Sequence, residues 1–365
     1  MPRKLRIAMP LTDAFGGHGG IALYNRDVLA ALSDHAGVAQ IVALPRIAAP
    51  FSETVPAKVD WRAASARGAA SFVAQAAKVA LADRPIDLVW CAHVNLLPVC
   101  RPLAVALGAR LVLALYGVEA WEPFERSSAI PVLRHVDRIV SISAFTRDRF
   151  CAWSNFDPAK VDIVANAIDL DAYSDGPKSP DLVERYSLSG HKVVMILGRM
   201  HPTERRKGFD ELLEALPEIR AQRPEVVALL AGSGGDMARL QAKAGELEIA
   251  DAVRFTGPVA EAEKAAHYRL ADAYVMPSSQ EGFGFVHLEA MACGTPAVGS
   301  RADGAREAVR DGAIGQLLDP ADRASIVAAT LRALDTPRGI PPGLAHFAYP
   351  RFARETAGFV DRVMA

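Results

Sequence analysis

The sequence predicts an α/β protein made of two Rossmann-like domains, each a parallel sheet covered by helices on both faces. The chain has 365 residues, of which 51% are hydrophobic, and this is enough for two domains of ordinary size. Short runs rich in Val, Ile and Leu alternate with longer helical patterns, as in parallel sheets linked by helices. The alternation is interrupted by one Gly-, Pro- and Ser-containing segment near the middle and then resumes, so the plan occurs twice.

The apolar runs give the expected strands. In the first half they are residues 5–9, 41–44, 88–92, 111–115, 139–142 and 161–164; in the second half they are 193–197, 226–231, 253–255, 273–276, 296–298 and 315–318. A helix is expected over 19–34, where Ile21, Tyr24, Val28 and Leu32 share one face.

Two breaks in the pattern divide the chain. The linker DAYSDGPKSP at 171–180 separates an N-terminal domain, residues 1–172, from a C-terminal domain, residues 173–340. The segment TPRGIPP at 336–342 precedes a final helix within 341–365, whose apolar side holds Phe352, Phe359 and Val363. We expect this helix to pack back toward the N-terminal domain.

Composition excludes several classes of protein. The net charge of −1 gives no reason to expect nucleic acid. No apolar run reaches the roughly 18–20 residues of a membrane span, and the N-terminal apolar stretch is too short for a signal peptide. Four scattered cysteines, without a CxxC, argue against disulfides or structural zinc and favour the cytoplasm. A slight basic excess in 1–170 is either ordinary solvated surface or a peripheral contact with an anionic membrane face.

The most informative segment is SSQEGFGFVHLEAMACGTP at 278–296, which runs from a strand through a Gly-containing loop into a helix near residue 285. This places it at the carboxyl edge of the sheet, where ligands bind. Gly282 and Gly284 permit a close backbone approach, and the helix start suits phosphate. Glu281 and Glu289 bracket the turn, and a carboxylate can accept hydrogen bonds from both hydroxyls of a sugar diol.

A second segment, GRMHPTERRKGFDELL at 198–213, follows another strand. Arg199 at the strand end and Lys207 before the helix are expected to converge on a diphosphate and stabilise its negative charge. Arg205 and Arg206 fit an ordinary solvated loop.

The glycine-rich segment after the first strand contains Gly17, Gly19 and Gly20 and leads into a helix, which is again suited to phosphate. A plain mobile turn is the alternative. AGSGGD at 231–236 is either a ligand loop or simple turn chemistry. DLD at 169–171 fits a turn better than a metal motif, because it lies at the linker.

Taken together, these segments resemble glycosyltransferase family 4, whose fold is GT-B. The resemblance covers nearly the whole chain: FGGHGG, YGVEAW, SISAFTRDRF, VANAIDLDAY, the Arg–Lys segment, AGSGGD, VRFTGPV, the Glu-x7-Glu segment and DGAREAV. It implies two domains facing a central cleft, and transfer of a sugar from a nucleotide donor with retention at the anomeric carbon and generally without metal.

The resemblance also implies roles for individual residues. Glu289 matches the glutamate that holds the ribose diol, Glu281 the one that contacts the donor sugar, and Arg199 with Lys207 the diphosphate clamp. The remaining donor-binding positions are matched by Gly17, Gly19, Gly20, Asn166, Gly232, Val259, Gly282, Phe283 and Gly284.

Three positions depart from the family pattern. Tyr116–Gly117 stands where many relatives have His-Gly, so the sugar-contacting role of that histidine is open between Tyr116 and His93 at the end of the third expected strand. Gly232–Ser233–Gly234 lacks the usual acid, and Asn166–Ala167 lacks the usual glycine.

The sequence therefore predicts a cytoplasmic, metal-independent, retaining hexosyltransferase without a cofactor. We expect a UDP- or GDP-sugar donor and a saccharide or lipid-linked saccharide acceptor, in polysaccharide, lipopolysaccharide or glycolipid synthesis. The alternatives are a GT-B epimerase or phosphorylase and a non-catalytic nucleotide-sugar-binding protein. A phosphorylase would need a pyridoxal-binding lysine, and Lys243 and Lys264 lie in polar helical stretches.

Overall fold

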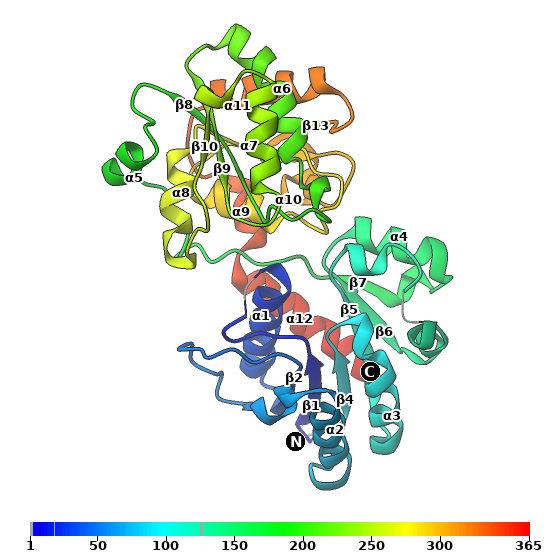
Figure 1. Cartoon of the computed structure of the whole chain (residues 1–365). Helices are drawn as coiled ribbons and strands as arrows, with labels where there is room; N and C mark the ends of the chain where they lie inside the picture. The colour runs from blue at the N-terminus through cyan, green and yellow to red at the C-terminus, as the bar shows by residue number, and fades with distance from the viewer. Residues whose placement is uncertain (1–2, 18, 125–126) are drawn as a thin grey trace. The chain divides into compact units, whose positions relative to one another are not determined.

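The computed structural model describes residues 3–17, 19–124 and 127–365. The chain divides into two compact units: Met1–Ala167 with Tyr349–Ala365, and Ile168–Ala348. These divisions, at 167/168 and 348/349, lie five and eight residues from the expected boundaries at 172/173 and 340/341. Each unit is a parallel sheet flanked by helices (Figure 1), so the predicted Rossmann-like architecture is confirmed.

The N-terminal unit has a seven-stranded parallel sheet in the order β3-β2-β1-β4-β5-β6-β7. Its strands are β1 (Leu5–Leu11), β2 (Val38–Pro45), β3 (Val59–Trp61), β4 (Leu88–Cys91), β5 (Arg110–Leu115), β6 (Arg138–Ser141) and β7 (Val161–Ile163). The edge strand β3 was not predicted. It has only three residues, all half-buried, and so lacks the continuous apolar run of a central strand.

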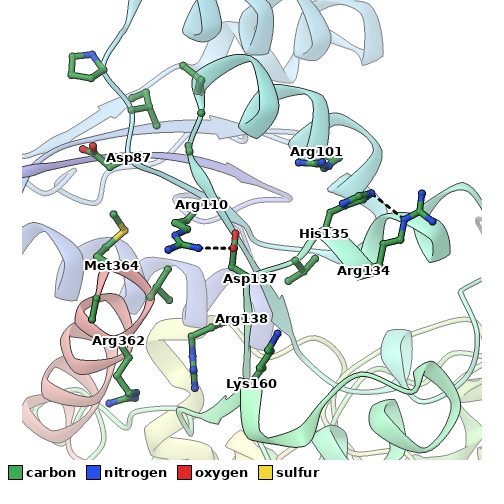
Figure 2. Close-up of a pocket in the computed structure, with 18 of the residues that line it drawn as sticks. Asp87, Arg101, Arg110, Arg134, His135, Asp137, Arg138, Lys160, Arg362 and Met364 are labelled. Carbon is green, nitrogen blue, oxygen red and sulfur yellow. Dashed lines mark hydrogen bonds and ion pairs between the residues drawn. The ribbon is translucent and has the colours of Figure 1, made fainter.

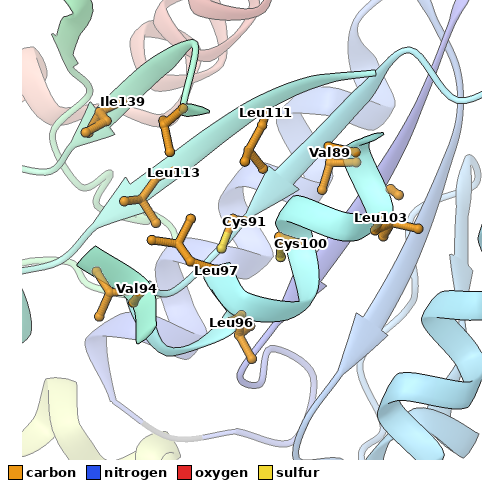
Figure 3. Packing of buried hydrophobic residues seen from close by; sticks show 14 of the residues in the cluster. Val89, Cys91, Val94, Leu96, Leu97, Cys100, Leu103, Leu111, Leu113 and Ile139 are labelled. Atoms are coloured by element: carbon orange, nitrogen blue, oxygen red, sulfur yellow. The ribbon is translucent and has the colours of Figure 1, made fainter. Parts of the chain in front are cut away.

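Helices cover both faces of this sheet. They are α1 (Gly20–Asp34), α2 (Ala69–Ala82), α3 (Leu97–Leu107), α4 (Ala144–Ser154) and α12 (Tyr349–Met364). Successive strand residues point to opposite faces. In β4, Val89 and Cys91 join the cluster that contains Leu97 and Cys100 of α3 (Figure 3). Trp90 faces the other way and meets Phe359 of α12, with ring centroids 5.4 Å apart.

Helix α12 comes from the far end of the sequence but packs beside α1 (Figure 1). Phe352 lies edge-on to Tyr24, with centroids 5.4 Å apart, and Nε2 of His35 lies 3.1 Å from Asp361. The prediction that the last helix returns to the N-terminal domain is confirmed.

The C-terminal unit has a six-stranded parallel sheet in the order β10-β9-β8-β11-β12-β13. Its strands are β8 (Lys192–Leu197), β9 (Val226–Ala231), β10 (Val253–Phe255), β11 (Ala273–Val275), β12 (Ala297–Ser300) and β13 (Gln316–Leu318). The helices are α5 (Pro180–Arg185), α6 (Phe209–Gln222), α7 (Met237–Glu246), α8 (Lys264–Leu270), α9 (Phe285–Ala292), α10 (Ala305–Ala308) and α11 (Arg323–Asp335). Within the described residues, no helix combines the length and apolarity that crossing a membrane requires.

Candidate active site

The loop between β11 and α9 lies at the carboxyl edge of the C-terminal sheet, as the sequence predicted. Gly284 caps α9 with a φ of 93°, a conformation that favours glycine. A Cβ there would lie 2.7 Å from Nδ1 of His287. Phe283 is buried and packs against Phe347, with centroids 5.6 Å apart. These contacts fix the path of the loop that carries Glu281 and Gly282.

Lys207 and Glu281 form an ion pair at this edge. Nζ of Lys207 donates to Oε2 of Glu281 over 2.8 Å, and their side chains are 24% and 18% exposed. Lys207 is placed by the turn before α6, where Gly208 has a φ of 95° and its absent Cβ leaves room for the backbone of Pro277. The two predicted segments are therefore brought together across the sheet edge.

The ion pair sets the charge of both groups. The charge of Glu281 raises the pKa of Lys207, so the ammonium is retained. Burial alone would raise the pKa of Glu281, but Lys207 outweighs it and the pKa lies below its ordinary value. Both side chains are thus ionised at neutral pH, and a cation and an anion stand side by side in a partly desolvated site.

Asp303 holds the Glu281 loop in place and was not identified from the sequence. Its Oδ2 accepts from Oγ of Ser278 at 2.6 Å and from the backbone N–H of Glu281 at 2.9 Å. Burial raises its pKa to about 7, against the opposing effect of these hydrogen bonds. The sequence signal that could have drawn attention to it is the Asp303–Gly304 pair of DGAREAV. In the structure this glycine is required, because a Cβ on Gly304 would lie 2.1 Å from the carbonyl oxygen of Gly282.

Glu289 lies one turn into α9 and is fully buried. Its Oε1 accepts from the Tyr173 hydroxyl at 2.8 Å and its Oε2 from the Tyr268 hydroxyl at 2.5 Å, while Nζ of Lys264 is 3.7 Å away. Burial raises the pKa of Glu289, opposed by Lys264 and the two tyrosines. The sequence analysis missed both tyrosines. The Tyr173 hydroxyl also lies 3.0 Å from Oε1 of Glu261, so its single proton is shared between two carboxylates.

Arg199 behaves differently from Lys207. Its side chain is 80% exposed, and its guanidinium forms an ion pair with Glu204 at 2.6 Å. The structure therefore does not join the two predicted clamp cations in one contact. Arg199 lies just after β8, at the strand end as expected.

The loops that carry Gly232 and Val259, two of the predicted donor-binding positions, are neighbours. The N–H of Gly232 donates to the carbonyl oxygen of Gly257 at 3.1 Å. Gly257 lies two residues before Val259, whose side chain is half-buried. A Cβ on Gly232 would lie 2.0 Å from the carbonyl oxygen of Gly198, so this glycine is required by close backbone packing. This supports the turn interpretation of AGSGGD and leaves ligand contact a prediction.

In the N-terminal unit, the glycine-rich loop leads directly into α1. Gly19 precedes the helix with a φ of 93°, and open space surrounds the Cβ positions of Gly19 and Gly20. Gly17 packs against Asp13, where a Cβ would lie 2.6 Å from a carboxylate oxygen. His18 of the same motif lies outside the described residues.

Tyr116 and His93, the two candidates for the role of the family's sugar-contacting histidine, have different surroundings in the structure. The Tyr116 hydroxyl is buried and donates to Oδ1 of Asn25 at 2.8 Å, which ties β5 to α1. His93 follows β4, and its Nδ1 accepts from the N–H of Asn95 at 3.1 Å. Burial lowers the pKa of His93, so its neutral ring carries the proton on Nε2 and can donate from that atom.

Asn166 and Asp169 lie near the division between the units. Asn166 is 5% exposed, and its Oδ1 is buried without a hydrogen-bond donor among the described residues. Oδ1 of Asp169 accepts from the N–H groups of Asp171 and Ala172 at 2.9 and 3.1 Å. This confirms the predicted turn at DLD.

Comparison with known proteins agrees with this geometry. The model described as Glycosyltransferase Family 4 matches residues 18–172, and the model described as Glycosyl transferases group 1 matches residues 184–341. A GDP-mannose-dependent alpha-(1-6)-phosphatidylinositol monomannoside mannosyltransferase of Mycolicibacterium smegmatis is 34% identical over 279 residues, which are 73% of this chain and 72% of that protein. This chain belongs to glycosyltransferase family 4.

Further relatives and solved structures are also similar to this glycosyltransferase. A D-inositol 3-phosphate glycosyltransferase of Geodermatophilus obscurus is 36% identical over 212 residues, 55% of this chain and 46% of that protein. The Anabaena protein HepE, solved with UDP-glucose, matches with a TM-score of 0.74 at 21% identity, covering 98% of this chain and 100% of HepE. The lipopolysaccharide galactosyltransferase WaaB matches at 0.73 and 17%, covering 98% and 99%. The predicted GT-B fold of the glycosyltransferase is confirmed.

Proposed function

We propose that this glycosyltransferase moves a hexose from a nucleoside diphosphate sugar to a hydroxyl of a saccharide or lipid-linked saccharide, with retention at the anomeric carbon and without a bound metal. The observation that carries the proposal is the Lys207–Glu281 pair at the carboxyl edge of the C-terminal sheet. It holds one cation for a leaving diphosphate and one carboxylate for the donor sugar, 2.8 Å apart.

Lys207 supplies the electrostatic part of the reaction. Cleavage of the bond between the anomeric carbon and the β-phosphate oxygen leaves about three negative charges on the nucleoside diphosphate. A fixed ammonium that is already partly desolvated stabilises this charge with little reorganisation. Arg199 exchanges Glu204 for the diphosphate and adds a second cation, in the place that bound Mg²⁺ has in metal-dependent transfer.

Retention follows if attack takes place on the face that the leaving group departs from. The acceptor hydroxyl oxygen bonds to the anomeric carbon, and its proton passes to the departing phosphate oxygen. Glu281 orients the sugar during this exchange. The protein then acts by positioning and by charge stabilisation, and Nε2–H of His93 donates to a sugar hydroxyl in the role of the family histidine.

Glu289 binds the nucleoside. Each of its oxygens already accepts one tyrosine hydroxyl and has a second lone pair for a ribose hydroxyl. Gly232 and Val259 border the base, while Gly17, Gly19, Gly20, Asn166 and the turn Gly282–Gly284 complete the donor-binding set. All these roles rest on the match to the family motifs.

The mannosyltransferase relative makes GDP-mannose the first donor to test, with UDP-glucose second because HepE was solved with it. That relative is named for a phosphatidylinositol monomannoside acceptor, which supports a glycolipid acceptor reached by peripheral contact with the cytoplasmic membrane face. Synthesis of a cell-surface polysaccharide or lipopolysaccharide is the wider expectation.

A panel of GDP- and UDP-sugars tests the proposal. We expect one hexose donor to raise the melting temperature and to be hydrolysed slowly without acceptor, releasing a sugar of unchanged anomeric configuration by NMR. Lys207→Ala is expected to stop the hydrolysis, whereas Arg206→Ala, next to it and exposed, serves as the matched control. Epimerised or phosphorylated products, or binding without turnover, would favour the alternatives and contradict the proposal.

A further inference from the structure

A cavity of about 1050 Å³ opens at the amino edge of the N-terminal sheet, where no function has been assigned (Figure 2). Arg110 begins β5, Arg138 begins β6 and Lys160 immediately precedes β7, so the parallel strands bring three cations to one edge. His93 and Tyr116 follow strands at the opposite edge. Because β5 has six residues, the two edges are about 20 Å apart.

Part of the charge in the cavity is neutralised internally. Arg3 pairs with Asp87, and Arg110 pairs with Asp137 at 3.1 Å. Asp162, just outside the cavity, accepts from two further lining residues, Arg138 and Arg362, each at 2.8 Å. Four cations therefore share three carboxylates.

Three more lining cations have no carboxylate partner among the described residues: Arg101, Arg134 and Lys160. Arg134 donates instead to Nε2 of His135 at 3.1 Å. With the four paired cations, seven positive side chains face three carboxylate side chains, so among the described residues the positive side chains at this hollow exceed the negative ones by four.

The exposed ring of His135 lies beside two of these cations. Its pKa is lowered by desolvation and further by the charges of Arg101 and Arg134. Like charges held close together without a counter-ion destabilise one another, and an anion placed between them removes this repulsion.

We propose that this cavity is a binding site for a phosphate group, carried either by a soluble phosphorylated molecule or by a lipid head group. Guanidinium groups match phosphate oxygens through paired N–H donors, and an ammonium adds a point charge. The volume lies at the upper end of the range for small-molecule sites, so it accommodates more than inorganic phosphate. None of the residues assigned to donor binding lines this cavity.

Charge-neutralising variants test the proposal. The cavity variant carries Arg101→Gln, Arg134→Gln and Lys160→Gln. The control carries Arg67→Gln, Lys78→Gln and Arg185→Gln, three exposed cations outside the cavity, so both lose the same net charge. Both are made in a Lys207→Gln background and compared with Lys207→Gln alone, so that the proposed diphosphate site is weakened and contributes equally to all three proteins.

Pyrophosphate is titrated by calorimetry, and vesicles of phosphatidylcholine with phosphatidic acid are tested by co-sedimentation against pure phosphatidylcholine. We expect the cavity variant to lose at least about tenfold in affinity for one or both probes, since each charge-assisted hydrogen bond contributes substantially. The affinity of the control should stay within about twofold of that of its parent.

Loss of affinity for pyrophosphate alone identifies a soluble ligand, and loss of affinity for the vesicles identifies a lipid head group. Equal affinity in both variants, or no binding by the parent, would overturn the proposal.

Discussion

The hydroxyl of Tyr173 lies 2.8 Å from Oε1 of Glu289, although the two residues are 116 positions apart in the sequence. Tyr173 lies near the start of the C-terminal unit, before its first helix α5, and Glu289 lies in helix α9. The proposed ribose-binding carboxylate is therefore positioned by the first residues of its unit as well as by its own helix.

Glu289 and Glu281 should differ in the kinetic effect of their removal. Glu289→Gln is expected mainly to raise the donor KM and weaken free nucleoside diphosphate, because the ribose diol does not change during reaction. Glu281→Gln should mainly lower kcat and leave the affinity for free nucleoside diphosphate almost unchanged. Steady-state kinetics and titration of GDP or UDP measure both effects. If Glu281→Gln weakens the free nucleotide as much as Glu289→Gln does, the division of roles is wrong.

Lys207→Ala should lower turnover by about 10²–10³-fold, the magnitude typical of losing one preorganised charge-stabilising donor. The fold should be retained, since Lys207 lies in a turn. Arg199→Ala is expected to have a similar effect, because its exposed guanidinium can leave Glu204 and bind the diphosphate as the second cation. Turnover at saturating donor measures this, with Arg206→Ala as the control. Near-normal turnover in the Lys207 or Arg199 variant would refute that residue's role.

Activity is expected to persist in excess EDTA. Two cations, Lys207 and Arg199, are available for the leaving diphosphate, and Asp169 is engaged by backbone N–H groups of its own turn. Initial rates with and without EDTA are the measurement. Complete loss that Mn²⁺ restores would identify Asp169 and Asp171 as metal ligands instead.

Asp303 should make stability fall as pH rises. Its pKa moves from an ordinary 3.8 to about 7 in the folded state, chiefly through burial. Between these values the folded chain holds a proton that the unfolded chain has lost, so the free energy of unfolding decreases with pH and levels off above the folded pKa. Three pKa units correspond to roughly 4 kcal/mol at most.

Urea unfolding of wild type and Asp303→Asn across this pH range isolates the effect, because other titrating groups cancel in the difference. Ser278→Ala removes one hydrogen bond that stabilises the ionised carboxylate, so it should raise the pKa of Asp303 in the folded state. The pH range over which stability falls should then extend to higher pH. Parallel pH profiles for wild type and Asp303→Asn would contradict the assignment.

The central strands were predictable because burial on both faces imposes an unbroken apolar sequence. Strand β9 was predicted with its observed bounds, Val226–Ala231, and all six of its residues are buried. Strand β12 extends through Gly299 and Ser300, which are small and buried but carry no apolar signal.

The candidate site was predictable only where a motif is continuous in sequence. Glu281 and Glu289 stand in one segment, and their spacing and the glycine turn drew attention to both. Tyr173, Tyr268 and Asp303 reach them from other elements, as isolated polar residues with no local pattern. Such contacts arise from tertiary packing, which a single sequence does not display.

Helix α12 also constrains the order in which the protein can fold on the ribosome. Phe352 and Phe359 cover Tyr24 and Trp90 of the N-terminal unit, yet they are synthesised only after all of the C-terminal unit. Until then, the first sheet emerges with an apolar face unprotected. We expect a nascent chain arrested before Tyr349 to recruit chaperones and to be sensitive to protease at α1, although its C-terminal sheet is already complete.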